Sequence, residues 1–208
     1  MDKVARAPAT PLCATPRSRS RVMLEALWFG VLIAAALGGC ATGPPRRGTS
    51  APPLAEAGWI AVPDLVYVPQ EGRGDCGAAA LAMVLGRWGL NVDPAAMLTR
   101  TGPIDEKAGL QFAQLRSIVR AEGLKSFLIV GTFEDLVYEV ERGRPVIVGV
   151  LRRVNTRGFQ HYAVVTAVNR QTRRVLTADP ADGWQRQDWK DFEVLWRFSR
   201  NLALVAWP

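Results

Sequence analysis

Residues 70–83 read QEGRGDCGAAALAM, a glycine-rich loop that runs into small and apolar residues. The pattern predicts a helix that begins at Cys76 and ends near Trp88, with Asp75 at its N-cap. A cysteine in this position lies at the positive end of the helix dipole, beside unpaired backbone N–H groups that favour the reactive thiolate. Gln70, six residues earlier, could donate a side-chain N–H to an oxyanion hole, together with the cysteine's own backbone N–H. The alternative is a glycine-rich turn before an ordinary core helix.

Cys76 is one of three cysteines in the chain. We expect Cys13 to leave with an export signal and Cys40 to be acylated, so that Cys76 remains as a free thiol in a compartment that favours disulfides. A lone cysteine can be an inert buried side chain. The residues that follow it along the chain favour a nucleophile instead.

His161 is the single histidine, and the sequence FQHYAVV at 159–165 predicts that it stands at the start of a strand. It follows the lone thiol in the order that a Cys–His pair requires. Asp179 comes eighteen residues later, and antiparallel pairing would return its carboxylate to the histidine, where it could fix the imidazole tautomer. Asp179 could instead only form a turn with Pro180. Asp182 could also take this role, but Asp179 is favoured because it is nearer the strand end.

These residues resemble those of the C39-type peptidases, papain-like cysteine peptidases best known for trimming double-glycine leaders from bacteriocin precursors. The resemblance spans residues 66–183 and rests on the segments at 70–77, 87–89, 161–165 and 179–183. It implies that Cys76 is the nucleophile, His161 the general base, Asp179 the residue that orients the base, and Gln70 an oxyanion donor.

The order of the predicted elements favours an α+β domain, with helices in its first part and strands in its second. Helical spacing and turn residues predict helices at 76–88, after Pro94, and at 110–121, 133–142 and 187–198. Runs rich in Val and Ile predict strands at 66–68, 126–130, 145–151, 162–169, 174–177 and 202–207. By the resemblance, we expect a papain-like fold in which an N-terminal helical part, with the cysteine helix, packs on a mostly antiparallel sheet that carries the histidine and the aspartate.

Residues 1–40 are predicted to be a lipoprotein signal peptide. Arginines at 17, 19 and 21 precede an uncharged apolar run at 26–39, which is shorter than the roughly 20 residues of a spanning helix. The run ends in Leu-Gly-Gly-Cys at 37–40, which resembles a bacterial lipobox. Cys40 would then carry a diacylglycerol and become the mature N-terminus. The alternative is an N-terminal membrane helix that happens to end in a cysteine.

Such an anchor would tether the protein to the bacterial cell envelope on the periplasmic side, since two or more acyl chains suffice for stable attachment. Ala41, rather than an aspartate, follows the cysteine and favours the outer membrane. Residues 41–58 are rich in Pro, Gly, Ala and Thr and are predicted to be a linker. Residues 59–208 are then one peptidase domain.

The charge of the chain is compatible with a role at the cell envelope, and it does not indicate a nucleic-acid partner. Residues 1–40 hold five of the 26 basic and two of the 19 acidic residues, which leaves 21 against 17 and a net charge of +4. No cluster of Lys and Arg with interleaved aromatics marks a nucleic-acid groove, and we read the charge as ordinary solvation. A single histidine does not make a conventional His-rich zinc site, and we expect neither metal nor organic cofactor.

The sequence therefore predicts a cysteine peptidase that hydrolyses peptide bonds of exported or cell-envelope proteins. Many similar domains are fused to a transporter that delivers a cytoplasmic precursor, whereas a lipobox predicts an exported domain, so the double-glycine specificity is not carried over. One alternative is an amidase or transpeptidase on the same site, because a triad fixes the acyl-enzyme but not its acceptor. The other is a catalytically silent lipoprotein that binds peptides or acts as a scaffold.

Overall fold

The structure, a computed structural model, describes residues 54–100 and 109–208. The predicted signal peptide with Cys40, and residues 41–53 of the predicted linker, lie outside the described residues. The helices are α1 (Cys76–Arg87), α2 (Pro94–Arg100), α3 (Phe112–Ala121), α4 (Phe133–Glu141), α5 (Trp189–Trp196) and the short 3-10 helix η1 (Arg197–Ser199). The strands are β1 (Trp59–Ala61), β2 (Lys125–Val130), β3 (Val146–Val154), β4 (Arg157–Asn169), β5 (Arg174–Asp179), β6 (Gly183–Asp188) and β7 (Leu202–Trp207). None of these helices is both long enough and apolar enough to span a membrane.

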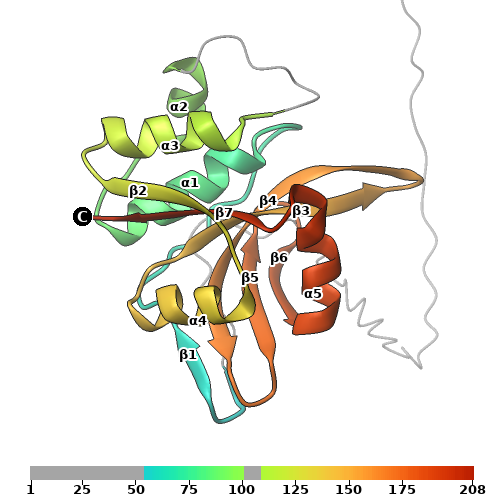
Figure 1. The fold of residues 1–208 in the computed structure, drawn as a ribbon. Coiled ribbons are helices and arrows are strands. Elements are labelled where there is room, and N and C mark those ends of the chain that lie inside the picture. Colours follow the sequence, from blue (N-terminus) through green and yellow to red (C-terminus); the bar gives the residue numbers. More distant parts are fainter. Residues whose placement is uncertain (1–53, 101–108) are drawn as a thin grey trace, which may run out of the picture. The chain divides into compact units, whose positions relative to one another are not determined.

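The strands form a single sheet in the order β2-β7-β3-β4-β5-β6, and β1 pairs with the end of β4 (Figure 1). Every one of these pairings is antiparallel. The central hairpin of β3 and β4 is the longest pairing, from Val146 opposite Val165 to Val154 opposite Arg157. The prediction of an antiparallel sheet that carries His161 on one strand is confirmed.

Helices cover both faces of this sheet, and each face has its own hydrophobic core. Successive side chains of a strand point to opposite faces, and β3 follows this rule. Ile147 belongs to the core that contains α1, α2 and α3, whereas Val146 and Val148 belong to the core that contains α4 and α5. Figure 1 shows α1, α2 and α3 grouped together, apart from α4 and α5. The cysteine helix thus packs on the sheet within an N-terminal helical group, as predicted.

Helix α1 is the most deeply buried helix of the first core. All residues from Cys76 to Leu85 are buried, and a helix buried all round must be apolar all round. Small side chains let it approach the sheet closely. A Cβ atom at Gly77 would lie 3.2 Å from the Tyr162 ring of β4 and 3.3 Å from the Cβ of Leu110, so glycine at this position allows the cysteine end of α1 to reach β4.

Several strands differ from the predicted elements, and β1 at Trp59–Ala61 was not predicted. Residues 66–68, predicted as a strand, form none, because Tyr67 is held by its side chain, as described below. Strand β6 was not predicted either. Its residues, GWQRQD, are mostly polar and half-exposed, and β5 is its one strand neighbour in the described sheet. Residues 187 and 188, predicted to begin the last helix, therefore end β6, and α5 begins at Trp189.

Strand β4 also differs from the prediction, because it begins at Arg157 rather than at 162. A two-residue turn at 155–156 joins it to β3, and Asn155 takes the left-handed conformation there, with φ of 55°. Residues 157–159 are exposed, so they lack the apolar pattern that marks the buried part of the strand. His161 therefore lies inside a strand and not at its entrance.

Candidate active site

Cys76 is the first residue of α1 and is a free, buried thiol, 8% exposed. Asp75 occupies the N-cap position, as predicted, but its side chain does not cap the helix. The Asp75 carboxylate instead accepts a hydrogen bond of 2.8 Å from the backbone N–H of Gly72. The first turn of α1 holds no acidic residue, so no charge within the helix offsets the positive end of its dipole. Cys76 therefore lies at the positive end of the α1 dipole.

The loop that precedes Cys76 depends on its glycines. Gly74 has φ of 89°, in the left-handed region that glycine adopts without strain. A Cβ atom at Gly72 would lie only 2.9 Å from the carboxylate of Asp75. The loop can therefore fold back, and it brings Gln70 to the pocket that Cys76 also lines, as the sequence predicted.

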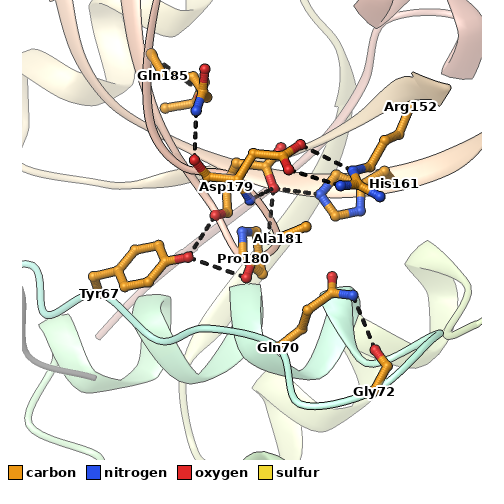
Figure 2. Close-up of polar contacts among 11 residues, drawn as sticks. Tyr67, Gln70, Gly72, Arg152, His161, Asp179, Pro180, Ala181 and Gln185 are labelled. Atoms are coloured by element: carbon orange, nitrogen blue, oxygen red, sulfur yellow. Dashed lines mark hydrogen bonds and ion pairs between the residues drawn. The ribbon is translucent and has the colours of Figure 1, made fainter. Parts of the chain in front are cut away.

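His161 and Asp179 come from the neighbouring strands β4 and β5 and contact each other directly. His161 Nε2 lies 2.7 Å from Asp179 Oδ1 (Figure 2), and the two residues are 2% and 8% exposed. The same carboxylate oxygen accepts the backbone N–H groups of Ala181 at 2.8 Å and Asp182 at 3.1 Å. Because Asp179 occupies Nε2, Nδ1 is the ring nitrogen that remains for Cys76.

The environment of His161 stabilises its protonated form. Burial by itself disfavours the charged imidazolium, but hydrogen bonding to Asp179 and Cys76, together with their negative charges, outweighs burial and raises the pKa of His161 to about 9. The three residues therefore form a connected group, in which Asp179 and Cys76 both stabilise the protonated form of His161.

Asp182, the alternative partner for the histidine, is engaged elsewhere. Its two carboxylate oxygens bind the guanidinium of Arg152, at 3.0 Å from Nε and 2.8 Å from Nη2. This bidentate contact lowers the pKa of Asp182. The structure thus brings Asp179, and not Asp182, to His161.

Tyr67 ties the segment before the cysteine helix to the turn that carries Asp179. Its ring is fully buried, and its hydroxyl oxygen lies 2.8 Å from the carbonyl oxygen of Asp179 and 3.1 Å from that of Pro180 (Figure 2). Burial, with the nearby charge of Asp179, raises the pKa of Tyr67 to about 12. The backbone N–H of Gln70 donates to the same Pro180 carbonyl at 2.9 Å. No local sequence pattern predicts these contacts, because they join residues more than a hundred positions apart.

Gln70 lies in the site, but its side-chain amide has a competing partner. Its Nε2 donates a hydrogen bond of 3.0 Å to the carbonyl of Gly72 (Figure 2), while its Oε1 is buried without a partner among the described residues. One proton of the amide nitrogen is left for another acceptor. The predicted oxyanion role is therefore compatible with the position of Gln70, through this second proton or after rotation of the amide.

Tyr162 is a further residue of the site that the sequence analysis did not single out. It follows the histidine, is 2% exposed, and packs its ring edge-on against Phe112, with centroids 4.9 Å apart. Its hydroxyl accepts a hydrogen bond of 2.9 Å from Gln160 Nε2. Burial, together with the nearby Cys76, raises the pKa of Tyr162, so this hydroxyl stays neutral in the site.

A pocket of about 620 Å³ opens over these residues. One wall is the loop from Gln70 to Cys76, and the other is the β3–β4 hairpin from Arg152 to Tyr162. Within residues 54–100 and 109–208, no cluster of three or more His, Cys, Asp or Glu side chains could hold a metal ion. The site can therefore present a free thiol at a helix N-terminus, an acid–base pair and hydrogen-bond donors to a molecule in the pocket.

The sequence matches the model of the peptidase C39 family over residues 64–208. It is similar to the peptidase domain of Streptococcus ComA, a bi-functional ABC transporter involved in a quorum-sensing pathway, with 26% identity and a TM-score of 0.56 over 68% of this chain and 97% of that chain. No curated protein matches it.

Two further solved structures share the fold at lower identity. A double-glycine motif protease from an AMS/PCAT transporter, solved with a leader peptide, is 21% identical, with a TM-score of 0.56 over 79% of this chain and 99% of that chain. A C39-like peptidase from Bacillus anthracis is 16% identical, with a TM-score of 0.57 over 72% of this chain and 98% of that chain. These likenesses confirm the predicted papain-like fold.

Proposed function

We propose that this chain, which belongs to the peptidase C39 family, is an active cysteine peptidase that hydrolyses peptide bonds. Cys76 is the nucleophile, His161 the acid–base residue and Asp179 the residue that orients it. The observation that supports this assignment best is the buried hydrogen bond of 2.7 Å between His161 Nε2 and Asp179 Oδ1. It leaves Nδ1 for a thiol at the start of a helix whose first turn carries no acidic residue.

The reaction follows from the charge state of the pair. The Cys76 thiolate attacks the peptide carbonyl carbon, a C–S bond forms, and the carbonyl oxygen becomes an oxyanion. Imidazolium His161 then gives its proton to the amine nitrogen as the C–N bond breaks and the thioester remains. In the second half, neutral His161 takes a proton from water, the resulting hydroxide attacks the thioester, and the carboxylic acid and the thiolate are released.

Two donors are available to the oxyanion. The backbone N–H of Cys76 lies at the start of α1, where helix N–H groups have no intrahelical partner. The second donor is the remaining amide proton of Gln70. Donors preorganised for the developing charge stabilise a transition state more than they stabilise the substrate.

The open edge of β4 supports a peptide as the substrate. Pairing of β4 with β5 begins only at Val164, so residues 157–163 face no strand of the described sheet on that side. The pocket is lined by residues 157–162 of this stretch. An extended peptide could add to such an edge through main-chain hydrogen bonds. These bonds do not depend on the peptide's side chains, and they hold the peptide in one orientation.

The substrates are proposed to be exported or cell-envelope proteins. This part of the proposal rests on the signal peptide and lipobox predicted at residues 1–40. It also explains why we do not assign double-glycine specificity, which belongs to the transporter-linked neighbour.

The function is tested by alkylation of Cys76 over a range of pH, together with cleavage of a peptide library. Iodoacetamide should modify Cys76 of the folded full-length chain rapidly at pH 6, as read by peptide mapping because the chain holds three cysteines, and Cys76→Ala should abolish cleavage. In His161→Ala the imidazolium is gone, so reactivity should drop by a larger factor at pH 6 than at pH 10. A catalytically silent binding domain would instead react slowly at every pH until it unfolds, and would be insensitive to His161→Ala.

A further inference from the structure

We propose that the active-site pocket selects peptides that carry carboxylate side chains next to the scissile bond. The inference rests on the proposed peptidase function and adds a substrate class to it. Three arginines line the pocket, Arg73, Arg152 and Arg157, and among its described lining residues there is no aspartate or glutamate.

The three arginines are not equivalent. Both carboxylate oxygens of Asp182 bind Arg152, so the positive charge of Arg152 is balanced by that carboxylate. Arg73 and Arg157 are exposed, and neither has an ion pair with any described residue. The uncompensated positive charge of the pocket therefore comes from these two side chains.

Their positions place positive charge on both walls. Arg73 lies in the loop that leads into Cys76, and Arg157 opens β4, four residues before His161. The nearest acidic residues in the loop, Glu71 and Asp75, do not line the pocket, and the Asp75 carboxylate binds the backbone N–H of Gly72. A peptide bound in this pocket would meet an arginine from each of these two segments.

Charge of one sign on the walls of a cleft concentrates its field and raises the local concentration of opposite charge. The planar guanidinium also matches a carboxylate in a bidentate geometry. An exposed pair contributes about 1.4-fold to 5-fold in binding, so both arginines together should favour acidic peptides by about 2-fold to 25-fold. The preference should weaken between about 0.1 M and 1 M salt, because screening shortens from about 10 Å to 3 Å.

The experiment uses a synthetic library of random octapeptides, with cleavage sites read by mass spectrometry, and the full-length chain. Wild type should enrich Asp and Glu on both sides of the cut. Arg73→Gln/Arg157→Gln should lose this enrichment while Cys76 keeps its reactivity toward iodoacetamide, which carries no charge. Arg153→Gln is the matched control, since Arg153 is exposed on the same hairpin but does not line the pocket, and it should keep the preference.

Binding gives a second readout that does not need turnover. In the Cys76→Ala variant, a fluorescent Glu-containing peptide pool should bind more tightly than the same pool with Gln at those positions, and the ratio should fall with salt. Cleavage without acidic enrichment, or enrichment that survives in the double variant, would overturn this inference alone. No cleavage and no rapid alkylation of wild type would overturn the peptidase proposal, and this inference with it.

Discussion

The substitution Asp179→Asn separates the charge of the proposed orienting residue from its shape. Asparagine keeps an oxygen that can accept the backbone N–H groups of Ala181 and Asp182, as Asp179 Oδ1 does at 2.8 and 3.1 Å. The turn after β5 should therefore persist. What disappears is the negative charge that lies against His161 Nε2 at 2.7 Å.

The expected size of the effect follows from the pKa of His161. The folded protein raises it from 6.5 to about 9, which corresponds to about 3 kcal/mol in favour of the imidazolium. Loss of an adjacent opposite charge typically changes a pKa by one to three units, and we expect His161 to fall by one to two. At pH 8.5 the imidazolium population, and with it turnover, should decrease about three-fold to 25-fold. At pH 6 the imidazolium stays dominant, so this effect almost vanishes.

Stability should show the same change with a defined sign. Because the pKa of His161 is higher in the folded protein than in the unfolded chain, its contribution to stability is fully present below about pH 6.5 and is lost as pH rises through about 9. Between these limits wild type should lose about 3 kcal/mol from this group. Asp179→Asn should lose about 1.4–2.7 kcal/mol less.

The single histidine makes the measurement direct, because NMR titration of the imidazole has no background from other histidines. Urea unfolding at pH 6 and pH 9.5 measures the stability difference. Asp182→Asn is the matched control, since its carboxylate binds Arg152 and not the imidazole. The orienting role of Asp179 would be contradicted if the pKa of His161 were the same in Asp179→Asn as in wild type, or if Asp182→Asn lowered the pKa of His161 by more than Asp179→Asn does.

Three further changes test single contacts. Gln70→Ala should lower turnover by about 10²–10³ with unchanged unfolding by urea, as for loss of one oxyanion donor; an unchanged rate would remove Gln70 from the site. Tyr67→Phe removes the buried donor to the carbonyl of Asp179, while the carbonyl of Pro180 keeps the backbone N–H of Gln70. The free energy of unfolding should therefore fall by about 1–3 kcal/mol and turnover should fall with it; a stable variant with full activity would contradict the positioning role. Cys40→Ser should stay unprocessed or move to the soluble fraction, and wild-type protein that carries no acyl chain by mass spectrometry would rule out the lipobox.

The local sequence was sufficient to predict the elements that carry the site, because their signals are local. Small, apolar residues after Cys76 determine a buried helix, and glycines before it allow the loop to fold back. The choice between Asp179 and Asp182 was also predictable, because the strand end is where antiparallel pairing returns a side chain to His161. The start of β4 was not predictable, since residues 157–159 are exposed and alternation of apolar residues cannot mark a ribbon that buries neither face.

Contacts between distant segments carry no local signature, and Tyr67 shows why. Its hydroxyl contacts a carbonyl 112 residues away, and only the complete fold brings the two together. A tyrosine between two valines has the composition of a strand, so propensity alone assigned it to one. The tertiary contact overrides that propensity by fixing the ring under the turn of Asp179.

The positions of charged residues in the fold also could not be predicted from the local sequence, and these positions bear on the proposed choice of substrate. Summed over residues 41–208, 21 basic residues against 17 acidic ones indicate a surface of nearly balanced charge, which the sequence analysis interpreted as ordinary solvation. A sum cannot show where the charges lie. The fold brings Arg73 and Arg157 to opposite walls of one pocket and pairs Asp182 with Arg152, so a bound peptide meets a positive site on a weakly charged protein. Substitutions that change net charge without touching this pocket should therefore leave peptide preference unchanged. Arg153→Gln is the decisive control for that reason, because it removes one positive charge outside the pocket.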